Sequence, residues 1–528
     1  MQKSILLFNT VKFLKPIQVY YRLYYFGRRK VRNLLGVQYP LSMTSQSVAL
    51  TLRPSIVSAP LVNNKSFTFL NLSHTFEEKI DWNFSEYGKL WTYNLTYFDY
   101  LQQEKMTQEE GLQLIHDFID RSDSHKDALE PFPVSLRGIN WVKFLTTHKL
   151  QEQRIDDSLY AQYKILMDNL EYHLLGNHLL ENGFSLLFGA YYFQDEQLYA
   201  KAKEILTIEL EEQVLEDGGH FELSPMYHQI MLFRVLDCLN LLQNNLWQDN
   251  DLSELLTKKA VLMLQWLNTM TFEDGSIPLF NDSTNGIAPT TEQLNVYAKS
   301  LDINYRPSTI DYRLTDSGYR NLKTPDYECI IDVGAIGPDY IPGHAHADTF
   351  NFVLYIRPQT INHQPSTKIP FIIDTGLSTY ETNARRTEER STKAHNTVEI
   401  NSTSSSQVWG GFRVADRAYV TQLQERDEKV IATHTGYEKK FGMLHTRAWQ
   451  FKDKQIIIKD SLNKTGKAVV RLHFHPEVTE AMIEKHIEIA NGRSSIQTYD
   501  YAPEFNKLIA AKVLEIQFEK ETEVIINL

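Results

Sequence analysis

The stretch HLLENGFSLLFGAYYF at residues 178–193 decides the fold of the first half of this chain. Its apolar side chains recur at helical spacing, and the similar run EQLYAKAKEILTIELEEQVL follows at 196–215. Further runs of this kind lie at 158–175, 224–242 and 251–270. Short connections join them, and no strand-like alternation interrupts them. Residues from about 75 to 300 are therefore predicted to form one large helical domain.

The second half of the sequence has a different residue pattern. Short β-branched and aromatic runs, such as TFNFVLYI at 349–356 and KQIIIKD at 454–460, are separated by turn residues. Over about 200 residues this pattern predicts a large antiparallel sheet or sandwich. A chain of 528 residues is also too long for one core, since cores stop growing near roughly 250–300 residues. We predict an N-terminal segment over 1–75, a helical domain over 76–310 and a β domain over 311–528.

Composition excludes several classes of function. The net charge of −12 argues against a nucleic-acid partner. The two cysteines, Cys238 and Cys329, are too few for a disulfide framework or a thiolate zinc site. The sequence has no Walker A loop, dinucleotide-binding glycine fingerprint, HEXXH motif or G-x-S-x-G elbow, so nucleotide, hydride-transfer and serine-hydrolase chemistry lose their main support.

The N-terminal segment is strongly basic. Ten Lys and Arg residues precede Glu77, and no Asp or Glu does. The run VYYRLYYFGRRKVRNLL at 19–35 is expected to form a helix packed on the main body, with its charges solvated. The alternative is peripheral contact with an anionic membrane surface. Because the N-terminus lacks a clear signal-peptide pattern, we expect a cytoplasmic or membrane-associated protein, with the periplasm left open.

Two polar clusters stand at predicted helix starts. In the first, Asn177 and His178 begin a helix on which Glu181 shares a face with His178, so that Glu181 could hold its tautomer and raise its pKa. In the second, Ser224 and the following proline predict an N-cap, which places Tyr227 in the first turn. Tyr227 could act as a base if cations lie near it. Taken alone, each cluster is also consistent with an ordinary helix terminus.

A third cluster suits a metal. In an extended segment His344, His346 and Asp348 would point the same way. Zn²⁺ takes imidazole and carboxylate ligands, and His346, Asp374 and His395 together would form a three-ligand site. The structural alternative is an exposed pair of histidines in a loop.

A fourth stretch combines Tyr380 with three arginines, Arg385, Arg386 and Arg390. Arginines bind carboxylates or sulfates through two parallel hydrogen bonds. Arg385 and Arg390 are therefore candidates for binding or orienting an anionic substrate. Glutamates in the same stretch could instead neutralise these charges locally.

Taken in order, six segments resemble the heparinase II/III-type polysaccharide lyases and the related alginate and oligoalginate lyases. They are PVSLRGINWVKF (133–144), GNHLLENGFSLLFGAYYF (176–193), DGGHFELSPMYHQIML (217–232), PGHAHADTFNFVLY (342–355), FIIDTGLSTYE (371–381) and RSTKAHNTVEIN (390–401). The resemblance covers about residues 80–420, so the basic N-terminal 40 residues lie outside it.

The resemblance implies an α+β multidomain fold, in which an N-terminal incomplete (α/α) toroid precedes a C-terminal antiparallel β-sandwich. It implies an anionic poly- or oligosaccharide substrate containing uronic acid, cleaved by β-elimination between the two domains to leave an unsaturated sugar. The resemblance implies that Asn177 and His178 neutralise the substrate carboxylate, with Glu181 orienting His178. It implies that Tyr227 and His344 transfer protons, with Tyr380 nearby. It also implies a mainly structural Zn²⁺ bound by His346, Asp374 and His395.

Two other functions compete with this interpretation. A glycoside hydrolase would need two carboxylates flanking the scissile bond, for which Glu181, Asp217 and Glu222 are available. An inactive carbohydrate-binding or assembly protein would have the fold without the chemistry. A hydrolase is less favoured than a lyase, because the motifs supply Tyr and His where a hydrolase needs acids. A binding protein is less favoured because Asn177, His178, Tyr227, His344 and the metal set occur together.

Overall fold

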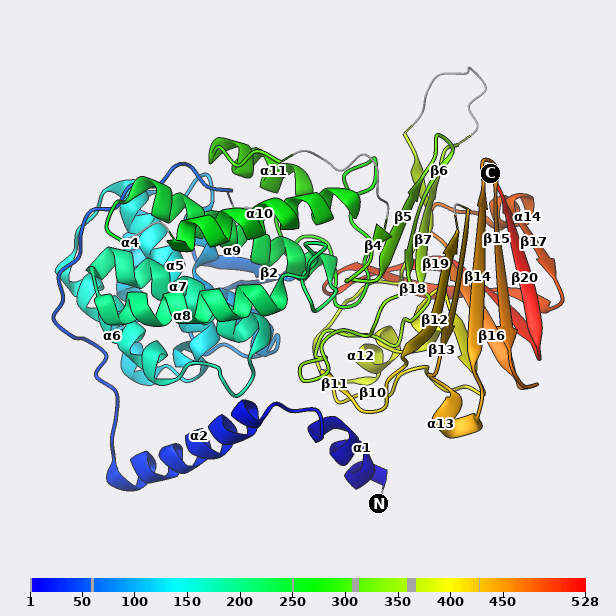
Figure 1. Ribbon diagram of the computed structural model, residues 1–528. Coiled ribbons are helices and arrows are strands. Elements are labelled where there is room, and N and C mark those ends of the chain that lie inside the picture. Colours follow the sequence, from blue (N-terminus) through cyan, green and yellow to red (C-terminus); the bar gives the residue numbers. More distant parts are fainter. Residues whose placement is uncertain (1, 58–60, 249–250, 306–312, 359–366, 427) are drawn as a thin grey trace.

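Most of the helices and most of the strands lie in separate halves of the molecule (Figure 1). The computed structural model describes residues 2–57, 61–248, 251–305, 313–358, 367–426 and 428–528, and the predicted boundary between 310 and 311 lies outside them. The helices of the first half are α3 (Lys89–Tyr97), α4 (Gln108–Asp120), α5 (Pro131–His148), α6 (Gln153–Asp168), α7 (Gly176–Phe193), α8 (Glu196–Gln213), α9 (Pro225–Asn244), α10 (Asp251–Thr269) and α11 (Thr291–Ser300).

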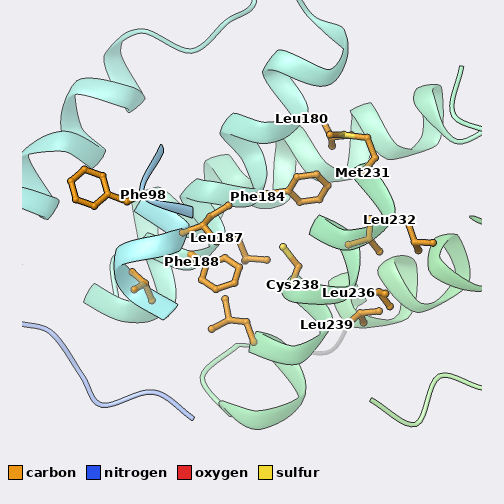
Figure 2. Close-up of a cluster of buried hydrophobic side chains, with 14 of the residues drawn as sticks. Phe98, Leu180, Phe184, Leu187, Phe188, Met231, Leu232, Leu236, Cys238 and Leu239 are labelled. Carbon is orange, nitrogen blue, oxygen red and sulfur yellow. The ribbon is translucent and has the colours of Figure 1, made fainter. Parts of the chain in front are cut away.

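The core of the helical half lies between helices that the sequence pattern predicted. Figure 2 shows Phe184, Leu187 and Phe188 of α7 beside apolar side chains of α9, among them Met231 and Cys238. All five side chains are almost completely buried. Burying each contributes roughly 1.5–3 kcal/mol relative to exposure, so this packing holds α7 and α9 in place.

Local capping explains where several helices begin. Thr107 and Glu110 form a reciprocal capping box at the start of α4. At α9, Ser224 Oγ accepts a hydrogen bond from the backbone N–H of Tyr227, as expected for an N-cap followed by proline. One helix is shorter than predicted, because α6 ends at Asp168 and the predicted run continued to residue 175.

The second half consists of antiparallel sheets. Within the described residues, a five-stranded sheet has the order β4 (Arg313–Leu314), β5 (Tyr319–Lys323), β6 (Tyr327–Asp332), β7 (Phe352–Ile356) and β8 (Ile369–Ile372). A six-stranded sheet has the order β12 (Val420–Arg426), β13 (Lys429–His434), β14 (His445–Lys452), β15 (Gln455–Leu462), β20 (Glu521–Asn527) and β17 (Ile487–Ala490). A four-stranded sheet has the order β18 (Arg493–Glu504), β19 (Lys507–Phe518), β16 (Ala468–His473) and β9 (Val398–Ile400).

A second hydrophobic core joins these three sheets. It includes Phe352 of β7, Trp449 of β14 and Leu472 of β16, all buried. Strand β14 alternates buried and partly buried residues along most of its length, as expected when one face is covered. Smaller elements complete the half: β10 (Val408–Trp409), β11 (Arg413–Val414), α12 (Ala384–Glu389), α13 (Glu438–Phe441) and α14 (Glu480–His486).

The N-terminal segment forms two helices, α1 (Gln2–Val11) and α2 (Pro16–Leu35), along one side of the molecule (Figure 1). Residues 37–57 form no helix or strand, and β1 (Val62–Asn63), β2 (Ser66–Phe69) and β3 (Leu72–Thr75) form a small sheet. In the described part of the chain, no helix has both the length and the apolar composition needed to cross a membrane.

Candidate active site

Residues from both halves of the molecule meet at one place. Tyr227, in the first turn of α9, has its hydroxyl oxygen 3.2 Å from that of Tyr380, which lies between β8 and α12. The ring of Tyr227 is 3.9 Å from that of His344, centroid to centroid. His344 belongs to the segment between β6 and β7, and its Nε2 lies 3.5 Å from Asn177 Nδ2 at the start of α7. Four predicted catalytic residues are thus brought together.

A sharp backbone reversal places Asn177. Leu175 and Gly176 have φ values of 64° and 59°, which turn the chain immediately before α7. A Cβ on Gly176 would also lie 3.1 Å from Glu222 Oε1 and 2.8 Å from the side chain of Ile341. Glycine is required at 176 for two reasons: it adopts this positive φ without strain, and it has no Cβ to collide with Glu222 and Ile341.

His178, the fifth predicted catalytic residue, has a different acidic partner from the one predicted. Its Nδ1 lies 3.0 Å from Glu171 Oε1, in the loop between α6 and α7. Burial alone lowers the pKa of His178, but the charge and hydrogen bond of Glu171 outweigh it and raise that pKa. Glu171 is itself held by Asn182, whose Nδ2 donates to Glu171 Oε2 at 3.0 Å.

Glu181, which the sequence assigned to His178, is instead bonded to Arg234, whose Nε lies 3.2 Å from Glu181 Oε1. This corrects the predicted pairing. Asp217 is also engaged, because it accepts hydrogen bonds from Gly219 and Ser317. Two of the three carboxylates available to a hydrolase therefore have structural partners.

Glu222, the third of these carboxylates, faces the site. Neither of its side-chain oxygens has a hydrogen-bond partner among the described residues, and its Oε2 lies 3.7 Å from His344 Nε2. Burial raises the pKa of this carboxyl, and the neighbouring His344 and His178 oppose that shift. A single free carboxyl does not provide the pair that a glycosidase uses.

Asp282, in the loop between α10 and α11, organises the polar centre. It accepts hydrogen bonds from His344 Nδ1 at 2.9 Å and His346 Nε2 at 2.8 Å, and it pairs through both oxygens with Arg386. Although burial opposes ionisation, the charge of Arg386 and these hydrogen bonds hold the pKa of Asp282 well below its ordinary value. With Nδ1 of His344 donating to Asp282, a neutral His344 presents Nε2 as an acceptor.

Arg385 and Arg390, which were predicted to bind or orient an anionic substrate, both have partners within the protein. Arg390 is buried and donates to the backbone carbonyls of Ala345 and Gly411, so it orients the His344 segment and does not reach toward a substrate. Arg385 pairs with Glu389 at 2.8 Å and donates to the backbone of Asp500.

The three predicted metal ligands are buried close together. His395 Nδ1 lies 2.8 Å from Asp374 Oδ2, and the rings of His346 and His395 are 5.2 Å apart. Each ring has one nitrogen fixed by a carboxylate, while His346 Nδ1 and His395 Nε2 have no hydrogen-bond partner in the described part of the chain. Carboxylate-oriented imidazoles with a free nitrogen suit zinc.

Asp374 fits the metal less well than the two histidines do. Its Oδ2 also accepts from Asn351 Nδ2, and its Oδ1 accepts from the backbone of Gly376. Within the described residues, no three His, Cys, Asp or Glu side chains are arranged to hold a metal ion. Asp374 therefore serves in this structure as the partner that fixes the ring of His395.

The sequence pattern did not indicate Asp282, Glu171 or the central role of Arg386. Asp282 follows the apolar run PLF at 278–280, and the intervening Asn281 has a φ of 55°. An acid after an apolar run and a turn-forming asparagine is a weak signal that could have marked it. Nothing local could have linked Asp282 to Arg386, 104 residues away.

The sequence matches two family models that together span most of the chain. The model described as heparinase II/III N-terminus matches residues 23–305, and that described as heparinase II/III-like, C-terminal matches residues 306–523. A heparin-sulfate lyase from Bacteroides stercoris is 24% identical over 323 residues, which are 57% of this chain and 46% of that protein. The match spans less than half the length of this relative.

Solved structures share the fold. A crystal structure of heparinase III superposes with a TM-score of 0.69 at 16% identity, over 99% of this chain and 93% of the other. A heparan sulfate lyase from Pedobacter heparinus gives a TM-score of 0.54 at 15% identity, over 88% and 81% of the two chains. A chondroitin AC lyase from Streptomyces coelicolor A3 gives 0.53 at 9% identity, over 83% and 74%.

Proposed function

We propose that this chain, which belongs to the heparinase II/III family, cleaves a uronic-acid-containing polysaccharide by β-elimination. Membership confirms the resemblance found in the sequence motifs, and the family and its structural neighbours indicate a polysaccharide lyase. The names of the relatives favour a glycosaminoglycan as substrate. We also propose that the helical half is an incomplete (α/α) toroid, that the second half is an antiparallel β-sandwich, and that the substrate binds between them.

The observation that carries the proposal is the meeting of Tyr227, His344 and Asn177 across the two halves. Elimination removes the proton on the carbon next to the uronate carboxylate and protonates the departing glycosidic oxygen. It therefore needs a proton acceptor, a proton donor and groups that offset the carboxylate charge. The 3.9 Å separation of the Tyr227 and His344 rings places a donor and an acceptor beside each other.

The resting structure favours Tyr227 as the proton donor. Burial raises the pKa of its phenol well above the ordinary value, so the hydroxyl keeps its proton. His344, with Nδ1 bonded to Asp282, offers Nε2 to receive the proton from carbon. The electron pair of the broken C–H bond forms the new C=C bond as the C–O bond to the leaving sugar breaks, and Tyr227 protonates that oxygen.

The uronate carboxylate needs positive or hydrogen-bond-donating neighbours. Asn177 supplies amide N–H donors, and His178, whose pKa Glu171 raises, supplies positive charge. Stabilising the charge that develops in the transition state is commonly the largest contribution to catalysis. We assign these two residues to the carboxylate.

The first test follows ultraviolet absorbance while the protein acts on a panel of uronate polysaccharides. Wild type should generate the conjugated double bond, and Tyr227→Phe should lose about 10²–10⁴-fold in rate while keeping its fold. New reducing ends without absorbance would instead assign hydrolysis. Unchanged polymers across the panel, with tight binding of one of them, would assign a binding protein.

A second measurement separates the two proton-transfer roles. In heavy water, Tyr227→Phe should still exchange the substrate's C5 proton for deuterium without cleavage, because His344 remains as acceptor. His344→Gln should lose both exchange and cleavage. Loss of exchange in Tyr227→Phe, with exchange kept in His344→Gln, would reverse the assignment.

Zinc at His346, Asp374 and His395 belongs to the same proposal. The buried free nitrogens of the two histidines support it, whereas the carboxylate of Asp374 serves His395 in this structure. When bound, zinc would tie the segment that carries His344 to the segments that follow β8. We expect purified protein to contain stoichiometric zinc and His395→Ala to lose it, measured by elemental analysis; a zinc-free protein with an unchanged melting temperature after chelation would contradict this.

A further inference from the structure

Helix α2 lies on the protein with its polar side inward. Gln18, Tyr21, Tyr25, Arg28 and Arg32 form one stripe along it, at spacings of three and four residues. This stripe contacts the body: Gln18 Nε2 donates to the Leu174 carbonyl at 2.9 Å, Tyr21 stacks on Tyr172, and Arg28 and Arg32 pair with Asp168. The helix therefore uses its polar groups to attach to the protein, the reverse of an ordinary surface helix.

The opposite side of α2 is apolar and uncovered. Val19, Leu23, Phe26 and Leu34 follow one another on it, and Leu23 and Leu34 are 68% and 86% exposed. Lys30 lies on the same stripe, and its ammonium group sits 4.4 Å from the ring centroid of Phe26. A lysine at such a place can lay its stem along an apolar surface and keep its charge at the rim.

Helix α1 shows the same reversal. Asn9 is buried, and the hydroxyl of Thr10 accepts a hydrogen bond from Trp409 Nε1 at 3.1 Å, while Ile5 and Phe8 are 53% and 66% exposed. In the described part of the chain, fourteen of the twenty-four exposed large apolar side chains lie between residues 5 and 37. The exposed apolar surface is thus concentrated on two helices that run along one side of the molecule (Figure 1).

The charge on these helices has a single sign. Residues 2–37 contain eight Lys and Arg and no Asp or Glu: Lys3, Lys12, Lys15, Arg22, Arg28, Arg29, Lys30 and Arg32. No acidic side chain of the described residues forms an ion pair with Arg22, Arg29 or Lys30, which are all exposed. The remaining surface of the protein is acidic overall, since the whole chain has a net charge of −12.

We propose that α1 and α2 dock the protein on a lipid bilayer containing anionic phospholipids. The outward apolar side chains enter the headgroup boundary, and the unpaired basic side chains meet the lipid phosphates. The basic side chains that form no ion pair within the described residues, Arg22, Arg29 and Lys30, favour an anionic surface. Their positive charge disfavours pairing with a second copy of the chain, because two such faces would repel each other.

The test is sedimentation of the full chain with phosphatidylcholine vesicles, prepared with and without phosphatidylglycerol, at low and high salt. Wild type should bind the anionic vesicles about 10-fold more strongly, and high salt should weaken this preference. The double variant Leu23→Glu/Phe26→Glu should lose binding by about 10-fold or more. A matched control, Leu246→Glu/Val296→Glu, introduces the same charges at apolar side chains that are 93% and 64% exposed elsewhere, and it should bind like wild type.

Three results would overturn the proposal. The first is equal binding to both vesicle types. The second is equal loss of binding in the two double variants. The third is a dimer, measured by light scattering, that Leu23→Glu/Phe26→Glu disrupts while no vesicles are bound, which would assign the face to a second copy. None of these readouts uses catalytic activity, so they are independent of the proposed function.

Discussion

Asp282 and Arg386 form a bidentate salt bridge that joins the helical half of the molecule to the sheet half. Nη1 and Nη2 of Arg386 lie 2.5 and 2.7 Å from the two carboxylate oxygens of Asp282, and both side chains are buried. The same carboxylate also accepts the Nδ1 hydrogen bond of His344. The orientation of the proposed proton acceptor therefore depends on a contact between elements of different halves.

Asp282→Asn should reduce both stability and activity. The amide leaves Arg386 buried beside a neutral partner, and removing one member of a buried pair costs about 3–5 kcal/mol of unfolding free energy. Misorientation of His344 should lower kcat by about 10²-fold. Urea denaturation and the absorbance assay measure the two effects. Asp168→Asn is the control, because Asp168 likewise forms an ion pair with arginine, here with Arg28 and Arg32, but is partly exposed, and the substitution should cost under about 1 kcal/mol. Equal losses in both variants would contradict the prediction.

Tyr380→Phe should slow catalysis without disturbing the fold. The hydroxyl of Tyr380 lies 3.2 Å from that of Tyr227, and this hydrogen bond opposes the rise that burial causes in the Tyr227 pKa. Its loss should lower kcat by about 10-fold, in keeping with one hydrogen bond, and leave KM nearly unchanged. In the control Tyr499→Phe, the lost hydroxyl donates to the Phe474 carbonyl, and kcat should be retained. A wild-type kcat in Tyr380→Phe would exclude a role for this hydroxyl.

Glu171→Gln should weaken substrate binding in a pH-dependent manner. Glu171 raises the pKa of His178, so its neutralisation lowers that pKa and leaves fewer molecules with a charged imidazole at neutral pH. KM should rise about 10-fold near neutral pH, and the pH above which KM rises should be lower in Glu171→Gln than in wild type between about pH 5 and 8, because the burial that lowers the pKa of His178 is no longer offset. Steady-state kinetics across this range measure it. The matched variant Glu181→Gln should not reproduce the pH dependence; if it alone did, Glu181 would be the partner of His178.

Glu209→Gln should stabilise the protein at alkaline pH. Burial raises the pKa of Glu209 to about 7, and Gln213 partly opposes the shift through a 2.7 Å hydrogen bond. Because the pKa in the folded state is raised, full stability is present below about pH 4.5 and is lost as the pH rises through about 7, by about 3 kcal/mol.

Urea denaturation at several pH values tests this expectation. Glu209→Gln should be about 2–3 kcal/mol more stable than wild type near pH 8 and nearly equal to it near pH 4. Glu254→Gln, at an exposed position on α10, should show no such dependence. A pH-independent difference between wild type and Glu209→Gln would rule out ionisation of this carboxyl as the cause.

Features set by local interactions could be predicted from the sequence. The N-cap at Ser224 was predicted from the residue types alone, because a cap involves residues within one helical turn. The change from helices to strands was predicted from the periodicity of apolar residues, which depends on local backbone geometry. The succession of motifs around Asn177, Tyr227 and His344 was specific enough to indicate the family that the models then confirmed.

The partners of the site residues could not be predicted in this way. Glu181 shares a helical face with His178, yet the early end of α6 brings Glu171 to that histidine and leaves Glu181 to Arg234. Arg390 was predicted to bind an anion, but it is buried and donates its hydrogen bonds to backbone carbonyls. In both cases a tertiary contact outweighed the local pattern.

By itself, the sequence determined the order of helices and strands, the helix starts and the set of chemical groups available for the proposed elimination, because periodicity, capping and residue type are properties of neighbouring residues. Only the tertiary structure decided that Asp282 holds both His344 and Arg386, and that α2 turns its apolar side outward. The first outcome depends on buried charges that pair across long separations, since His344 and Arg386 are 62 and 104 residues from Asp282 in the sequence. The second depends on which face of α2 the rest of the fold leaves uncovered.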